Sequence, residues 1–223
     1  MGLEKFNIDT VGDLNRLKRK FYKTLEKWYE GNKVLLVDGA RQVGKTYLIF
    51  AFCKEHFSNY ISINLGLTPK AIASFGRACS VEDFLLVVSS YANKPLVSGD
   101  AVVFIDEIQL APQIDLIAMA KGFALDGRYR FIFSGSLLGV TEFKIALDPI
   151  GYLYEETMYP LDFEEFMWAN SVQEDVITMV KECFKERKAV PDFIHESLMN
   201  LFYVCLMVGG CLKLSLLMLR TKT

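Results

Sequence analysis

A loop framed by two glycines ends in a lysine followed by a threonine, residue types suited to holding phosphate groups. The residues that match the pattern G-x-x-x-x-G-K-[ST] are Gly39, Ala40, Arg41, Gln42, Val43, Gly44, Lys45 and Thr46. Glycines let the backbone curl so that successive N–H groups face phosphate oxygens, and a helix beginning at Lys45 adds the positive end of its dipole. The pattern predicts that Lys45 reaches the β- and γ-phosphates of a nucleotide and that the Thr46 hydroxyl binds Mg²⁺.

Two acidic residues in tandem supply the second half of this chemistry. Asp106 and Glu107 directly follow an entirely apolar run, residues 101–105. An acid at such a strand end holds Mg²⁺ in phosphate-loop enzymes, which predicts that role for Asp106. Glu107, one residue further on, is then placed to orient and deprotonate an attacking water. The alternative is that both acids simply begin a solvated loop.

Two serines follow a further apolar run, residues 131–133. A small polar residue at the tip of this strand can sense the γ-phosphate, which makes Ser134 and Ser136 candidates. An ordinary helix cap for the segment that starts at Leu137 is the other interpretation.

The motifs that a GTPase would show are broken in this chain. A D-x-x-G switch would need glycine at position 109, where the chain has Gln109, and an N-K-x-D loop would need aspartate where the chain has Leu96. Tandem acids after an apolar strand fit ATPases in which a glutamate primes water. We therefore expect ATP, with Mg²⁺, as the ligand.

Alternating strands and helices must position these groups. Strands are predicted at 34–37, 60–65, 101–105, 131–133 and 154–158, and helices at 14–28, 46–56, 81–91 and 112–124, with a short one from 68 and another from 162. This order predicts an α/β fold in which a parallel sheet of about five strands has helices on both faces. Ligands bind at the carboxyl ends of such strands, where the loop, both acids and the serines all lie.

Composition and net charge limit the classes of protein to which the chain can belong. The chain has 223 residues, a hydrophobic fraction of 52% and a net charge of −2, so no global basic field points to nucleic acid. Five cysteines without a C-x-x-C pair indicate reduced thiols of an intracellular, cytoplasmic protein, and no signal peptide is expected. The predicted helix 14–28 carries basic residues between its apolar ones, and that basic face is either a nucleic-acid contact or a solvated surface.

Four ordered motifs together resemble a known family. G-A-R-Q-V-G-K-T, F-I-D-E-I-Q, S-G-S-L-L-G and Y-P-L-D-F-E-E-F are similar to those of prokaryotic AAA-type ATPases that carry a C-terminal domain of unknown function. The resemblance implies an additional-strand P-loop fold, ATP with Mg²⁺, and a bacterial or archaeal cytosolic protein. It assigns Lys45 and Thr46 to Walker A, Asp106 and Glu107 to Walker B, and Ser136 or Ser134 to the sensor position.

The resemblance supplies no substrate, so three functions remain open. The first is an ATP-hydrolysing switch or motor. The second is a nucleotide-binding scaffold with negligible turnover. The third is a nucleic-acid-associated ATPase that uses the basic helix.

The chain departs from the family in two places. No arginine occurs between Phe131 and Phe184, so a hexamer that depends on an arginine finger is not expected. The segment 198–219 is apolar but contains Lys213, whose insertion at mid-bilayer would cost about 2.5–3.5 kcal/mol, which disfavours a membrane span.

We interpret this C-terminal segment as the start of a truncated domain and expect it to cause self-association. The predicted division is an N-terminal amphipathic helix in 1–30, an ATPase core in 31–170 and a helical segment in 171–223. The protein or nucleic-acid partner is not specified by the sequence.

Overall fold

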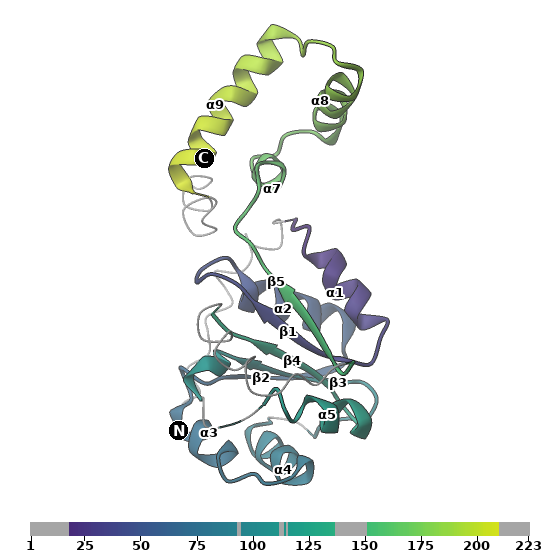
Figure 1. Ribbon diagram of the computed structural model, residues 1–223, viewed down its shortest axis with the longest axis vertical. Coiled ribbons are helices and arrows are strands. Elements are labelled where there is room, and N and C mark those ends of the chain that lie inside the picture. The colour runs from purple at the N-terminus through teal and green to yellow at the C-terminus, as the bar shows by residue number, and fades with distance from the viewer. Residues whose placement is uncertain (1–17, 93–94, 112–113, 115, 137–150, 210–223) are drawn as a thin grey trace. The chain divides into compact units, whose positions relative to one another are not determined.

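The computed structural model describes residues 18–92, 95–111, 114, 116–136 and 151–209 (Figure 1). These residues form two compact units. The α/β unit comprises residues 21–159, and the helical unit comprises residues 18–20 together with 160–209. The predicted division at 30 and 170 stays a prediction.

A five-stranded sheet forms the centre of the α/β unit. Its strands are β1 (Val34–Asp38), β2 (Asn59–Asn64), β3 (Ala101–Asp106), β4 (Arg130–Ser134) and β5 (Leu153–Thr157). They lie in the order β2-β3-β4-β1-β5, and every neighbouring pair is parallel. Because β4 lies between β1 and β3, the sheet has the additional-strand arrangement of P-loop proteins, which confirms the predicted fold class.

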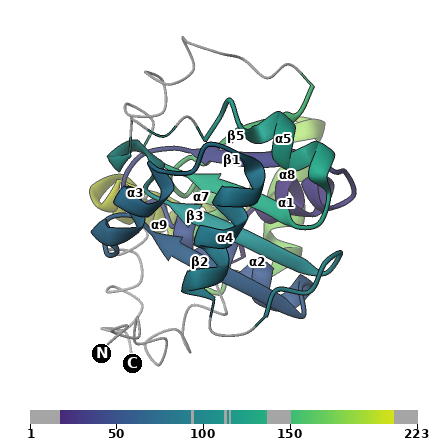
Figure 2. The ribbon, with the colours of Figure 1, turned by 90° about the horizontal axis from the view of Figure 1, so that it is seen from below.

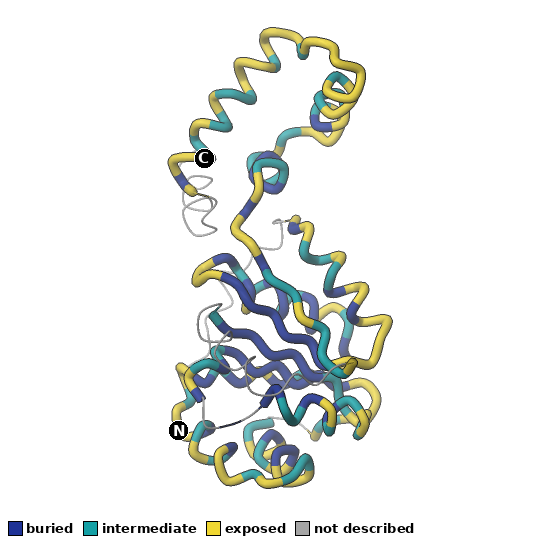
Figure 3. The backbone as a smooth tube through the Cα atoms, viewed as in Figure 1, coloured by how far each residue is buried: buried dark blue, intermediate teal, exposed yellow. Residues whose placement is uncertain are grey.

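Helices cover both faces of this sheet (Figures 1 and 2). On one face, α1 (Tyr22–Tyr29) and α2 (Lys45–His56) pack against Leu35, Phe104 and Ile132. On the other, α3 (Pro69–Phe75), α4 (Val81–Tyr91) and α5 (Ala120–Asp126) pack against neighbouring positions of the same strands. Because helices cover both sides, β1 and β3 are buried along their whole length (Figure 3), and both strands are apolar up to their final aspartate.

The helix predicted over 112–124 is shorter in the structure. The helix α5 begins at Ala120, and a 3₁₀ turn occupies Ile108–Leu110. Residues 112, 113 and 115 lie outside the described ranges. Ile114, Leu116 and Ile117 are all buried, and three buried positions within four residues exceed what one helix face offers. The described residues 116–119 accordingly form turns rather than the predicted helix.

The helical unit contains α7 (Phe163–Ala169), α8 (Glu174–Glu186) and α9 (Asp192–Val208). A capping box begins α7, because the Asp162 side chain accepts from the Glu165 N–H while the Glu165 side chain accepts from the Asp162 N–H. Its small core groups Leu161, Phe166 and Cys205. Among the described residues, no helix has the length and apolar character required to cross a membrane.

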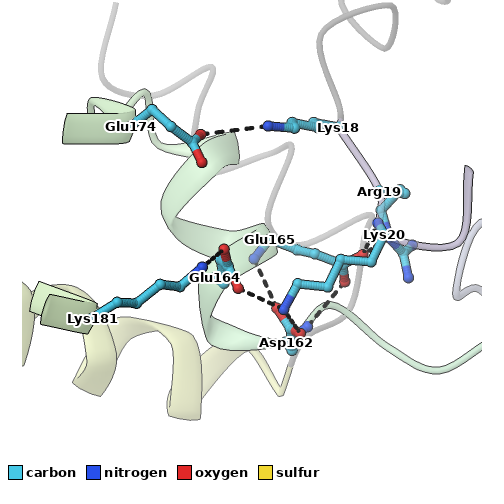
Figure 4. A network of polar contacts seen from close by, with 8 residues as sticks. All are labelled: Lys18, Arg19, Lys20, Asp162, Glu164, Glu165, Glu174 and Lys181. Carbon is cyan, nitrogen blue, oxygen red and sulfur yellow. Dashed lines mark hydrogen bonds and ion pairs between the residues drawn. The ribbon is translucent and has the colours of Figure 1, made fainter. Parts of the chain in front are cut away.

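An ion-pair cluster ties residues 18–20 to the start of α7 (Figure 4). The buried Arg19 guanidinium lies 3.1 Å from Glu165 Oε1, and Lys20 Nζ lies 2.6 Å from Asp162 Oδ2. The Lys20 N–H donates to Glu165 Oε1 at 2.7 Å. Because Glu165 binds this backbone, the helix predicted from residue 14 begins only at Tyr22 in the described part of the chain. Residues 1–17 lie outside that part.

Candidate nucleotide-binding site

The predicted phosphate loop connects β1 to α2 and is held closely against the end of β5. Gly39 has a φ of 143°, and a Cβ atom there would lie 2.2 Å from the Met158 carbonyl oxygen. The Met158 N–H also donates to the Asp38 carbonyl at 2.8 Å. Gln42 and Gly44 have φ values of 64° and 97°. The loop therefore needs glycine at position 39 for two reasons, a backbone conformation that side chains disfavour and the lack of space for a side chain.

Lys45 begins α2 and lies inside the curl of the loop. Its Nζ donates to the carbonyl oxygens of Gly39 and Ala40, at 2.9 and 2.8 Å. Burial lowers the pKa of Lys45, while the charges of Glu107 and Asp106 act in the opposite direction. The ammonium is thus held next to the loop by backbone carbonyls and faces an acidic edge of the sheet.

The other loop residues divide into exposed and packed positions. Val43 is buried in the core with α2, and Arg41 is exposed at the mouth of the loop. The positive charge of Arg41 lowers the pKa of Lys45 further, so the two cations act on the same region. A concentration of positive charge around curled backbone N–H groups is suited to an anionic ligand.

Asp106 lies at the end of β3 and is fixed by four donors. Its Oδ2 accepts from Thr46 Oγ1 at 2.7 Å and from Asn64 Nδ2 at 2.9 Å. Its Oδ1 accepts from the Glu107 N–H at 3.0 Å and from the Ser134 hydroxyl. The residue is 2% exposed. The structure thereby brings Thr46 and Asp106 into direct contact, and a hydroxyl beside a carboxylate is an oxygen-ligand pair that suits Mg²⁺.

Glu107 stands one residue beyond the strand in a left-handed conformation, with a φ of 59°. Its carboxylate accepts a hydrogen bond from Gln109 Nε2. The Gln109 Oε1 in turn accepts from the Ser136 N–H at 3.2 Å. The candidate base is therefore connected to the tip of β4 through one side chain.

The two candidate sensor serines are placed differently. Ser134 is fully buried and uses its hydroxyl on Asp106. Ser136 contacts the site through its backbone N–H, which binds Gln109. The structure brings Ser134 to the metal-ligand candidate, while the sensor role of either serine stays a prediction.

Sequence reasoning missed Asn64, Gln109 and Thr157. Asn64 is the last residue of β2 and pairs in register with Asp106, so a polar residue ending an otherwise half-apolar strand was a usable signal. The Thr157 hydroxyl donates to the buried Asp38 carboxylate. This contact could have been predicted only with the knowledge that β5 pairs with β1. No local pattern distinguishes Gln109.

A doubly covered parallel sheet with a phosphate loop after its first strand defines a P-loop nucleotide-binding protein. The model of the AAA domain family matches residues 31–167, so the chain belongs to that family, whose members bind nucleotide.

The chain is similar to many solved structures, of which two serve for comparison. One is the Walker-type ATPase PABY2304 of Pyrococcus abyssi, at 18% identity and a TM-score of 0.46, with 82% of this chain and 63% of that chain covered. The other is the structure of Drosophila ORC bound to DNA, at 14% identity and a TM-score of 0.48, with 90% and 58% covered. The chain thus spans less than two thirds of either structure. No curated protein matches it.

Proposed function

We propose that the chain binds ATP with Mg²⁺ at this site and hydrolyses the bond between the β- and γ-phosphates. The observation that carries the proposal is the 2.7 Å contact of the Thr46 hydroxyl with Asp106, beside the phosphate loop and one residue before Glu107. A phosphate cradle, a pair of Mg²⁺ ligands and a carboxylate base are the parts that P-loop hydrolysis needs.

Each residue then has one task. Lys45 exchanges its bonds to the loop carbonyls for contacts with the β- and γ-phosphates, and the loop N–H groups bind the remaining oxygens. Thr46 and Asp106 hold Mg²⁺, which neutralises phosphate charge when bound. Glu107 accepts a proton from the attacking water. Asn64 and Ser134 keep the Asp106 carboxylate in one orientation.

Nucleotide binding is tested with two variants, each of which replaces one lysine. Lys45→Ala should weaken ATP binding by about 10- to 150-fold, because a hydrogen bond to a charged group contributes about 1.5–3 kcal/mol. Lys33→Ala is the matched control, since Lys33 is exposed at the opposite end of β1. Calorimetric titration with Mg²⁺ and ATP measures both. Wild-type affinity in Lys45→Ala would remove the phosphate-loop assignment.

Hydrolysis is tested separately. Glu107→Gln should retain ATP binding while phosphate release falls by about two to four decades, the usual range for loss of a positioned base. Glu182→Gln, an exposed position on α8, should release phosphate at the wild-type rate. Unchanged turnover in Glu107→Gln would mean that a group other than Glu107 activates the water.

A nucleotide-binding scaffold is the second candidate. It keeps the same contacts of Lys45, Thr46 and Asp106 but turns over negligibly. Tight ATP binding by the wild type together with no phosphate release above a protein-free blank would favour it over the ATPase.

The described basic residues give less support to the third function, a nucleic-acid-associated ATPase, than the site gives to the first two. Lys18, Arg19 and Lys20 all form ion pairs with acidic residues of the helical unit, which reduces the positive charge they offer to a phosphate backbone. Stimulation of phosphate release by DNA or RNA, with a steep salt dependence, would support this function.

The proposed context is a prokaryotic, cytoplasmic protein of the AAA-type ATPases whose members carry a C-terminal domain of unknown function. It rests on the four motifs of the sequence.

A further inference from the structure

Gln109 makes two hydrogen bonds that link the candidate base to the neighbouring strand. Its Nε2 donates to the Glu107 carboxylate, and its Oε1 accepts from the Ser136 N–H at 3.2 Å. Glu107 follows β3, whereas Ser136 follows β4, and these strands are neighbours in the sheet. One amide therefore spans the edge of the sheet at which ATP is proposed to react.

The two partners fix the orientation of the amide. A carboxylate can only accept a hydrogen bond here, and a backbone N–H can only donate one. The reversed amide would place its oxygen against the carboxylate and its NH₂ group against the N–H, so both bonds would be lost. Gln109 therefore has a single orientation in which both of its polar groups are satisfied.

The backbone around Gln109 brings it to Glu107. Gln109 lies in the 3₁₀ turn Ile108–Leu110, in which the Leu110 N–H donates to the Glu107 carbonyl at 3.0 Å. Ile108 is 3% exposed and anchors this turn in the core. Glu107 has a left-handed conformation and directly precedes this turn. A buried anchor and a tight turn thus hold the base and the amide at a fixed separation.

We propose that Gln109 is a positioning residue that orients the Glu107 carboxylate toward the water attacking ATP. This inference rests on the proposed hydrolysis. A free glutamate side chain samples several rotamers, while a carboxylate held on one oxygen presents its other oxygen in one direction. Ser136 contributes through its N–H by fixing the far end of the amide. A carboxylate that is already oriented before the reaction loses less orientational freedom in the transition state than a freely rotating one.

A spectroscopic experiment tests the bond without nucleotide. The chain has four glutamines, Gln42, Gln109, Gln113 and Gln173, so selective side-chain ¹⁵N labelling yields four NH₂ pairs. The pair that disappears in Gln109→Ala belongs to Gln109. We expect that pair to shift in Glu107→Ala, while the Gln173 pair, identified in the same way, stays in place. An unmoved Gln109 pair overturns the proposal.

A kinetic experiment tests the use of the bond. Gln109→Ala should lower kcat for ATP about 10- to 150-fold, the range for losing a hydrogen bond to a charged group, while KM stays within about twofold. Gln173→Ala, an exposed control on the helical unit, should leave both unchanged. Should Gln109→Ala unfold, Gln109→Glu keeps the size and removes the donor, with the same expected loss.

The outcomes separate this proposal from the proposed function. A wild-type kcat in a folded Gln109 variant, or equal changes in kcat and KM, overturns the positioning role and leaves ATP hydrolysis intact. A wild-type chain that binds ATP and releases no phosphate overturns hydrolysis, and the positioning role with it. The amide spectrum still reports in that case whether the bond to Glu107 exists.

Discussion

Removing the Glu165 carboxylate should unfold the helical unit far more readily than removing any exposed acid. Three donors converge on this side chain, namely Arg19 Nε at 3.1 Å, the Lys20 N–H at 2.7 Å and the Asp162 N–H at 3.2 Å. The side chains of Arg19 and Glu165 are only 4% and 5% exposed. Glu165→Ala would bury the guanidinium without this counter-charge.

The expected loss of unfolding free energy in Glu165→Ala follows from that burial. Breaking a buried ion pair by deleting one partner costs about 3–5 kcal/mol, a large part of the stability of a small domain. The matched control is Glu186→Ala, which removes an acid paired with Lys188 at side-chain exposures of 57% and 72%. Exposed pairs contribute about 0–1 kcal/mol. The expected difference between the two variants is therefore about 2–5 kcal/mol.

The two tryptophans provide the assay. Trp28 lies in the α/β unit and Trp168 in the helical unit, so Trp168 fluorescence in a Trp28→Phe background follows the helical unit during urea unfolding. The free energy of unfolding is compared among the background, Glu165→Ala and Glu186→Ala. A loss below about 1 kcal/mol in Glu165→Ala, equal to that of the exposed control, would refute the reasoning from burial.

Four further predictions concern the site, the ligand, acid stability and association. Gly39→Ala should lower both the melting temperature and ATP affinity, because the new Cβ would lie 2.2 Å from the Met158 carbonyl oxygen. ATP should compete better than GTP for a labelled ATP analogue, since both GTPase motifs are broken. The helical unit should lose stability as the pH falls below about 4.5, the ordinary pKa of glutamate, because hydrogen bonds from Lys181 and then Lys20 lower the pKa of Glu164, and Glu164→Gln should flatten this loss. Deleting residues 209–223 should reduce self-association in size-exclusion chromatography.

Each of these has an outcome that contradicts it. An unchanged melting temperature in Gly39→Ala would mean that the loop and the end of β5 separate easily. Equal competition by the two nucleotides would show that motif loss does not select ATP. An acid unfolding curve that Glu164→Gln leaves unaltered would exclude the pairing with Lys181 as its cause. A full-length chain that elutes as a monomer, like the shortened one, would refute association through the C-terminal segment.

Local patterns predicted the parts of the fold that depend on neighbouring residues. The apolar run before Asp106 became β3, and Ser80 caps α4 by accepting from the Asp83 N–H at 3.1 Å. The helix predicted from 162 became α7, which begins with the capping box of Asp162 and Glu165. The two caps depend on groups within a few residues of one another, and the unbroken apolar run indicates a strand that is buried on both faces.

The parts that sequence reasoning missed depend on contacts between distant residues. Asn64 reaches Asp106 across 42 positions and Arg19 reaches Glu165 across 146. Glu165 also binds the backbone N–H of Lys20, two residues before α1 begins. The hydrophobic period of residues 14–28 carries no information about an acid so far along the chain, so it predicted a helix over residues 18–21, which are not helical.

The division of the helical unit between residues 18–20 and 160–209 sets an order of events during synthesis. A ribosome adding about 5–20 residues per second makes Glu165 about 7–30 s after Arg19, since the two are 146 positions apart. All five strands, up to Thr157, leave the ribosome before Glu165 does. The nascent chain can therefore complete its sheet while Arg19 is still solvated, and the ion-pair cluster closes as a late step that requires the nucleotide-binding half to be already made.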